Sequence, residues 1–229
     1  SANAGPGRGV QLSAAAGPHA GRLVMVGWDR TFPDPQRHDC IWYSDNAGTD
    51  WQVSETAIPM MNEAQVAEAG GGAVYFNSRT RGNITGKPSE VRASSLSTNG
   101  GQSFDLPVQW NPTLTEPGQG CQASVIGLPV AEPRYLFFSN PGAKSRTELT
   151  VRRSLDNGQT WPLKKVVHPG GSAYSCMTEL PDKTQLGLLH ERDAQGCKGP
   201  SCQTGAYSFP PPTRAAPFTS NRLCLLTVF

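Results

Sequence analysis

Ser44-Asp-Asn-Ala-Gly-Thr-Asp-Trp51 is the first of three similar octets in this chain. The other two are Ser97-Thr-Asn-Gly-Gly-Gln-Ser-Phe104 and Ser154-Leu-Asp-Asn-Gly-Gln-Thr-Trp161. Each begins with serine, has Asp or Asn at its third position and glycine at its fifth, and ends on a short polar residue and an aromatic. In a hairpin, the Asp or Asn oxygen accepts bonds from backbone N–H groups and the glycine takes a positive φ at little cost. The octets therefore predict three copies of one turn.

The spacing of the octets extends this prediction to the whole fold. Their serines are 53 residues apart (97 − 44) and then 57 apart (154 − 97). A repeat of roughly 40–50 residues or slightly more, with short strands between, is typical of the four-stranded blades of a β-propeller. Strand-like segments with turn residues beside them occupy 21–27, 73–77, 134–139 and 149–153. We predict an all-β fold, specifically a β-propeller; the alternative is an irregular sandwich with coincidental turns.

Composition argues against several classes of function. The 229 residues include 20 basic and 18 acidic side chains, a formal net charge of +2, which gives no support to nucleic-acid or membrane-surface binding. No run of about 20 apolar residues predicts a transmembrane helix. Cys197 and Cys202 lie close together, but no second pair at zinc-ligand spacing accompanies them. We therefore expect no metal, no cofactor and free or partly buried thiols.

The two ends of the chain differ from its middle. Residues 1–9 lack the apolar core of a signal peptide and resemble the middle of a loop, as though the chain begins inside a larger protein. Residues 207–217 are rich in proline, which predicts an extended or disordered segment. We expect residues 1–193 to form a partial propeller and 194–229 a divergent tail. Asn83-Ile84-Thr85 is a glycosylation acceptor if the chain enters the secretory route.

Four residues are candidates for chemistry, although each is ordinary when taken alone. Tyr174 follows what looks like a Gly-rich turn at 168–171, and an isolated tyrosine is more often a packing residue. Glu63, Arg79 and Arg146 stand in short polar segments, where a lone charge is usually solvated. Their significance depends on whether the fold brings them together.

In order and spacing, the segments from about residue 9 to 193 resemble the exo-α-sialidase (neuraminidase) family. The octets are similar to its Asp-box, or BNR repeat, which also occurs outside sialidases. More specific are the segments 9–12 with 21–24, 76–79, 137–141 leading to Arg146, Tyr174-Ser175 and 188–191. The run from Phe137 to Trp161 looks most like the animal lysosomal neuraminidase, whereas residues 17–23 also look like secreted bacterial members. The resemblance thus implies a lysosomal or secreted protein.

The resemblance also implies a role for each candidate residue. Tyr174 matches the nucleophile, and Glu63, 16 residues before Arg79 (79 − 63), matches the glutamate that activates it; Glu68 is the alternative. Arg79 and Arg146 match two of the three arginines that bind the substrate carboxylate, for which the bidentate guanidinium is suited. Sialic acid carries that carboxylate on its anomeric carbon, so a neutral phenol avoids the repulsion that an Asp or Glu nucleophile would meet. The implied reaction is retaining hydrolysis of terminal sialic acids on glycoproteins, oligosaccharides or gangliosides.

Two functional residues of the family have no counterpart here. The first arginine of the clamp, in an Arg-Ile-Pro strand, and the general-acid aspartate that follows it are not matched; Arg8, Asp29 and Asp34 stand in other contexts. We therefore expect about four of the family's six blades, with N-terminal blades of the same protein as missing partners, and little sialidase activity from this chain alone. A non-catalytic sialoside-binding propeller and a truncated product without independent function are the alternatives. The enzyme is favoured because a pure binder has no need of a Tyr–Glu pair.

Overall fold

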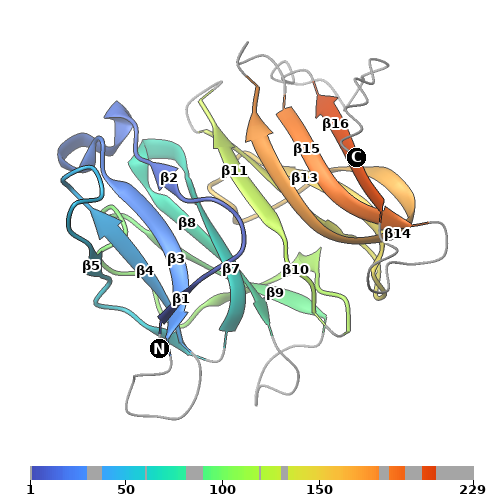
Figure 1. Ribbon diagram of the computed structural model, residues 1–229, viewed down its shortest axis with the longest axis horizontal. Helices are drawn as coiled ribbons and strands as arrows, with labels where there is room; N and C mark the ends of the chain where they lie inside the picture. The colour runs from blue at the N-terminus through green and yellow to red at the C-terminus, as the bar shows by residue number, and fades with distance from the viewer. Residues whose placement is uncertain are drawn as a thin grey trace.

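The computed structural model describes residues 2–29, 38–59, 61–80, 90–118, 120–129, 134–180, 186–193 and 203–209. These residues form three antiparallel sheets, which follow one another in chain order from blue through teal to orange in Figure 1. The first sheet contains β1 (Ala2–Ala4), β2 (Val10–Gln11), β3 (Leu23–Asp29), β4 (His38–Ser44), β5 (Gln52–Val53) and β6 (Ile58–Pro59). The second contains β7 (Met61–Glu68), β8 (Val74–Thr80), β9 (Val91–Ser97) and β10 (Gln109–Thr115). Two short 3-10 helices, η1 (Ala14–His19) and η2 (Gly70–Gly72), lie between strands.

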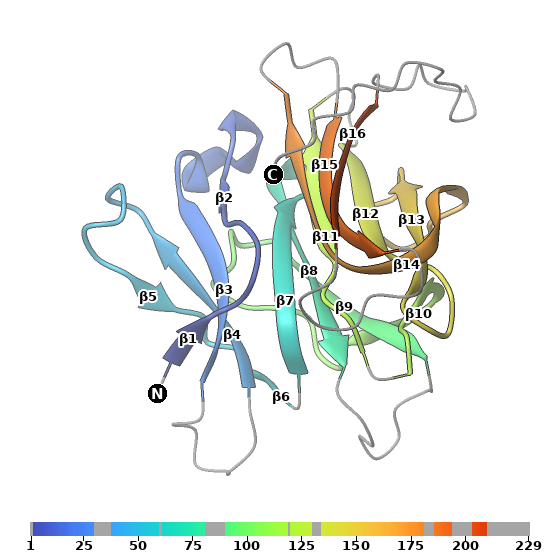
Figure 2. The ribbon, with the colours of Figure 1, turned by 45° about the vertical axis from the view of Figure 1, so that its right-hand side comes forward.

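The third sheet joins the strands of two successive blades. Its order is β11 (Ser124–Leu128), β12 (Tyr135–Pro141), β13 (Thr147–Ser154), β14 (Leu163–Glu179), β15 (Leu186–Asp193) and β16 (Gln203–Phe209). The first half of β14 pairs with β13 and its second half pairs with β15, and Gly171 belongs to both ladders. The turn predicted at 168–171 is therefore wrong: the glycines lie in a continuous strand that passes from one partner to the next, and Figure 2 shows its curvature. The all-β propeller prediction is confirmed.

The boundary expected at residue 193 falls inside this third sheet. β16 lies within the expected tail and pairs with β15 from Gln203 opposite Arg192 to Phe209 opposite Leu186. Residues 203–209 therefore extend the sheet. The proline-rich run that follows and the glycosylation acceptor at Asn83 lie outside the described residues.

The three octets form the same turn, as predicted. They connect β4 to β5, β9 to β10 and β13 to β14, so each lies at the same place in successive blades. In every octet the serine Oγ accepts a hydrogen bond of 2.9 Å from the N–H of the glycine four residues later. The Asp or Asn oxygen accepts one of 2.9–3.0 Å from the N–H four residues beyond it. The octet glycines have φ values of 87°, 89° and 85°, which glycine adopts without steric cost.

Apolar residues pack between neighbouring sheets. On β8, Phe76 belongs to the cluster shared with the first sheet, whereas its neighbour Tyr75 belongs to the cluster shared with the third. Successive side chains of a strand point to opposite faces, so this middle blade is buried on both sides. The same alternation places Phe137 and Phe138 of β12 in different clusters. This packing holds the ends of β7, β8 and β14 in fixed relation to one another.

The described part of the chain contains no helix with the length and apolar character needed to span a membrane. Cys40, Cys121 and Cys176 are free thiols; the first two are buried and the third is exposed.

Candidate active site

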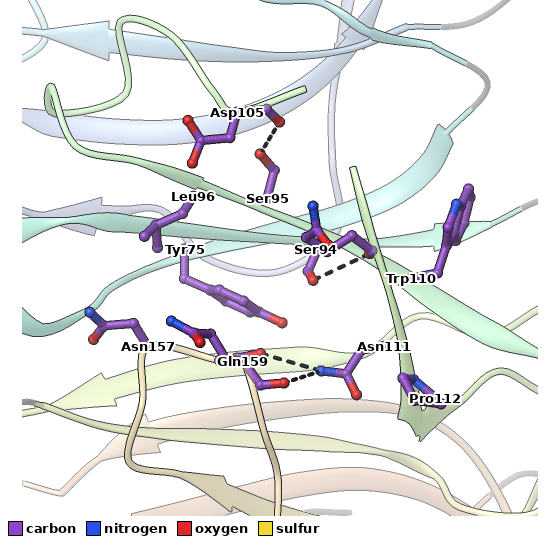
Figure 3. A pocket seen from close by; sticks show the side chains of 12 residues that line it. Tyr75, Ser94, Ser95, Leu96, Asp105, Trp110, Asn111, Pro112, Asn157 and Gln159 are labelled. Atoms are coloured by element: carbon purple, nitrogen blue, oxygen red, sulfur yellow. Dashed lines mark hydrogen bonds between the residues drawn. The ribbon is translucent and has the colours of Figure 1, made fainter. Parts of the chain in front are cut away.

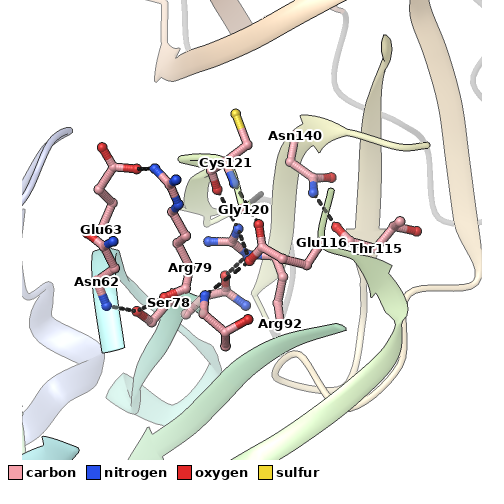
Figure 4. Close-up of polar contacts among 12 residues, drawn as sticks. Asn62, Glu63, Ser78, Arg79, Arg92, Thr115, Glu116, Gly120, Cys121 and Asn140 are labelled. Carbon is pink, nitrogen blue, oxygen red and sulfur yellow. Dashed lines mark hydrogen bonds and ion pairs between the residues drawn. The ribbon is translucent and has the colours of Figure 1, made fainter. Parts of the chain in front are cut away.

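Glu63 links two of the other candidate residues. Its Oε1 accepts a hydrogen bond from Tyr174 Oη, and its Oε2 accepts one of 2.5 Å from Arg79 Nη1. The side chains of Glu63 and Arg79 are 17% and 15% exposed, so this ion pair is largely shielded yet still reaches the surface. Figure 4 shows the two side chains pointing toward one another from neighbouring strands. A phenol, a carboxylate and a guanidinium thus form one hydrogen-bonded chain.

Glu63 and Tyr174 both occupy irregular steps in their sheets. The register of β7 against β8 shifts between Met61 and Ala64, and that of β14 against β15 shifts between Ser172 and Ser175. Such irregularities re-aim a side chain and leave a backbone group without its ladder partner. At Tyr174 the N–H donates instead to Glu191 Oε2 at 3.1 Å. Both functional side chains are therefore directed by local departures from regular pairing.

Arg146 lies on the other side of Tyr174, just before β13. Its Nη2 donates to the carbonyl oxygen of Gly120 at 3.0 Å, and its guanidinium carbon is 5.8 Å from the centroid of the Tyr174 ring. Gly120 also contacts Arg79, because a Cβ at this position would lie 2.5 Å from Arg79 Nε. The structure thus brings Tyr174, Glu63, Arg79 and Arg146 to one place.

Burial and the neighbouring carboxylate control the protonation of the site. Burial, followed by the hydrogen bond to Glu63 and its negative charge, raises the pKa of Tyr174 to about 12. The phenol is therefore neutral at pH 7 and needs an acceptor for its proton when it reacts. Burial alone lowers the pKa of Arg79, but the hydrogen bond to Glu63 and its charge raise it above the ordinary value. Arg79 remains a cation, able to bind a carboxylate.

Glu68, the alternative to Glu63, lies apart from this group. Both of its oxygens accept from Ser13 N at 3.1 Å, Oε1 accepts from Ser13 Oγ at 2.7 Å, and Oε2 is 3.3 Å from Arg134 Nη2. Its exposed fraction is 3%. Glu68 therefore holds the segment around η1 onto the sheets and does not contact Tyr174.

Three further residues support the site without having been predicted to do so. Gln122 Oε1 accepts from Ser175 N at 2.9 Å, directly beside Tyr174. Arg92 and Glu116 form a buried ion pair of 2.9 Å next to Arg79 and Gly120 (Figure 4). Glu191 stands in a segment that contributed to the family resemblance, but its bond to Tyr174 N had no signal in the sequence.

No cluster of three or more His, Cys, Asp or Glu side chains suited to a metal ion occurs among the described residues.

A second hollow, of about 430 Å³, lies away from these residues (Figure 3). It is bounded by β9, β10 and the third octet, and Tyr75 contributes to its wall. Asn111 Nδ2 donates to Gly158 O at 3.3 Å and to Gln159 O at 3.1 Å, so this amide serves the protein itself. No Lys or Arg is among its twelve lining residues. The hollow therefore lacks the cations that a sugar carboxylate requires.

Comparison with known proteins places the chain among relatives of one kind. No protein-family model matches it. A sialidase of Micromonospora viridifaciens is 37% identical over 195 residues, covering 82% of this chain and 28% of that protein. Sialidase-3 of Mus musculus is 36% identical over 212 residues, covering 82% and 45%. Among solved structures, a Hadza microbial sialidase superimposes with a TM-score of 0.71 at 29% identity, covering 91% of this chain and 38% of that one. The chain spans less than half the length of each.

Proposed function

Because this chain belongs to the sialidase family, we propose that it carries the nucleophile and part of the substrate-binding site of an exo-α-sialidase. In this proposal Tyr174 is the nucleophile and Glu63 its general base, while Arg79 and Arg146 bind the carboxylate of a terminal sialic acid. The observation that carries the proposal is the position of Glu63, whose two oxygens accept hydrogen bonds from Tyr174 and Arg79. An ion pair with a purely structural role needs no phenol on its second oxygen.

The proposed reaction has two displacements. In the first, Tyr174 Oη attacks the anomeric carbon, its proton passes to Glu63 Oε1, and the bond to the aglycone oxygen breaks; protonation of that oxygen falls to a group outside these four residues. In the second, water attacks the same carbon and the Tyr174 oxygen leaves, taking back the proton from Glu63. Two inversions at one carbon give overall retention. A pKa of about 12 for Tyr174 makes the acceptor necessary, because the free phenolate is scarce at neutral pH.

The two arginines act on the other substituent of the anomeric carbon. Arg79 lies beside Glu63, and Arg146 faces the ring of Tyr174, so both guanidinium groups lie close to the proposed attacking oxygen. A hydrogen bond to a charged group contributes about 1.5–3 kcal/mol, which makes each arginine a substantial part of substrate affinity. The proposed substrates are terminal sialic acids on glycoproteins, oligosaccharides or gangliosides, in a lysosomal or secreted setting.

We propose further that the 229-residue chain on its own turns over sialosides poorly. The resemblance implies a third arginine and a general acid that no residue of this chain matches, and general acid–base assistance typically contributes about 10²–10⁴-fold in rate. Robust hydrolysis of a fluorogenic sialoside by this polypeptide alone would contradict this part of the proposal.

The test of the proposed function compares wild type with Tyr174→Phe in the protein that carries this chain at its natural full length. We expect hydrolysis of a fluorogenic α-sialoside by wild type and its loss in the variant. The Kd for sialic acid should change by less than about threefold, because the phenol oxygen contributes to chemistry more than to binding. Undiminished turnover by Tyr174→Phe would refute the assignment of the nucleophile. Binding of sialosides by wild type without hydrolysis would instead favour the binding module.

A further inference from the structure

A buried ion pair lies directly behind the two arginines of the proposed site. Arg92 and Glu116 are each 1% exposed. Arg92 Nη1 donates to Glu116 Oε2 at 2.9 Å, and Arg92 Nε donates to Asn77 Oδ1 at 2.7 Å. Isolating charges from water is costly, and a buried pair is weak evidence for added stability. Its position therefore suggests a role other than stability.

The ion pair holds Cys121 on both sides. Glu116 Oε1 accepts from Cys121 N–H at 2.7 Å, and Arg92 Nη1 donates to Cys121 O at 2.7 Å. Glu116 Oε2 also accepts from Thr80 N–H at 3.2 Å, one residue after Arg79. The turn after β10 is thus tied to the end of β8, the strand that carries Arg79.

One peptide group transmits this arrangement to Arg146. The N–H of Cys121 and the C=O of Gly120 belong to the same planar trans peptide, in which the two bonds point in opposite directions. When Glu116 holds the N–H, it fixes the direction of the Gly120 carbonyl, and that carbonyl accepts from Arg146 Nη2 at 3.0 Å. Gly120 has a φ of +70° and lies against Arg79, so any rotation of this peptide moves the neighbours of both arginines.

We propose that Glu116 is a positioning residue for carboxylate binding: through the Gly120–Cys121 peptide, it sets Arg146 and Arg79 against Tyr174. The inference rests on the proposed function of this site. The chemistry requires a carboxylate, because donors approach both oxygens of Glu116. Glutamine has one acceptor oxygen, so in Glu116→Gln an NH₂ group must face either Cys121 N–H or Arg92. The arginines would then lose their fixed orientation while their own side chains remain.

Glu68→Gln is the matched control. Glu68 is also buried, paired with an arginine and bonded to a backbone N–H, but it contacts Ser13 and Arg134 rather than the site. The experiment measures KM, kcat and Tm for wild type and both variants with a fluorogenic α-sialoside, in the protein at its natural full length. We expect both variants to lose thermal stability. Only Glu116→Gln should raise KM, by about tenfold or more, with kcat less affected, because binding of the carboxylate depends on the placement of the arginines.

The outcomes separate this inference from the proposed function. Absence of hydrolysis and of sialic acid binding in wild type would overturn the proposed function, and this inference with it. Equal changes in KM for Glu116→Gln and Glu68→Gln, in an active protein, would overturn the positioning role alone. Should Glu116→Gln fail to fold, Gly120→Ala carries the test, since it keeps the ion pair and displaces the peptide at Arg79. An unchanged KM in folded Gly120→Ala would then overturn the inference, and an increase of about tenfold would support it.

Discussion

Replacing the glycine of each octet by alanine should destabilise the protein to three different degrees. The three positions have nearly the same backbone conformation, with φ values of 87° at Gly48, 89° at Gly101 and 85° at Gly158. What differs is the space available for a Cβ. At Gly48 the nearest atom is 3.7 Å away, at Gly101 a methyl carbon of Val24 lies at 3.3 Å, and at Gly158 the nearest atom, Tyr75 Cε2, is 2.2 Å away. The series therefore separates the cost of the backbone from the cost of packing.

The magnitudes follow from these two terms. A left-handed conformation costs a residue with a Cβ roughly 1–2 kcal/mol, and the lower entropy of the unfolded alanine chain offsets about 0.4–1 kcal/mol of this. Gly48→Ala should thus lower the free energy of unfolding by about 0.5–1 kcal/mol. Gly158→Ala adds an overpacking cost of about 1–3 kcal/mol, because its Cβ meets a buried ring, so a loss of roughly 2–4 kcal/mol is expected. Gly101→Ala should fall between them.

Urea unfolding followed by tryptophan fluorescence measures these losses. The midpoints should fall in the order Gly48→Ala, Gly101→Ala, Gly158→Ala, with unchanged m values if only native stability is affected. Trp161 is a suitable reporter, because it is 3% exposed and its ring centroid lies 6.0 Å from that of Tyr75. Equal losses for Gly48→Ala and Gly158→Ala would refute the packing of the third octet against the middle blade.

Three further predictions concern single side chains. Glu63→Gln should lower kcat/KM toward a fluorogenic α-sialoside by about 10²–10⁴-fold, since the Tyr174 proton loses its acceptor, and activity within a few-fold of wild type would contradict the assignment. Iodoacetamide should label the exposed thiol of Cys176 faster than that of Cys121, where burial raises the pKa to about 12; equal rates by peptide mass mapping would be inconsistent with this burial. Burial lowers the pKa of His190 to about 4, so the folded protein keeps it neutral while the unfolded chain takes up a proton near pH 6.5. Stability should therefore decline as pH falls from about 6.5 to 4, and urea midpoints of His190→Gln should show a shallower decline; an identical slope would argue against it.

Local sequence was sufficient to predict the octet turns. Their hydrogen bonds join residues two to four positions apart, so the serine, the Asp or Asn and the glycine carry the information within eight residues. The blades could be predicted from the recurrence of these turns. The junction at Gly171 could not, because a glycine pair reads equally as a turn or as a bend in a long strand. Which of the two forms depends on β13 and β15, the strands that pair on either side of it.

The site depends on contacts that no local pattern encodes. Tyr174 and Glu63 are 111 positions apart in the chain, and it was the family resemblance that pointed to this pair. The resemblance left Glu63 and Glu68 as alternatives, since the two glutamates share one strand. Their different surroundings, Tyr174 for one and Ser13 for the other, arise only in the folded chain. Glu116 had no signal, because Thr115-Glu116-Pro117 reads as an exposed turn and its partners come from other strands.

A covalent trapping measurement tests the central claim most directly. A fluorinated sialosyl fluoride, whose glycosyl-enzyme hydrolyses slowly, is incubated with the protein, and the peptide that contains Tyr174 is analysed by mass spectrometry. The account predicts the added mass of one fluorosialosyl group on Tyr174, and none on that peptide in Tyr174→Phe. A label on a carboxylate side chain, or continued turnover with Tyr174 unmodified, would contradict it.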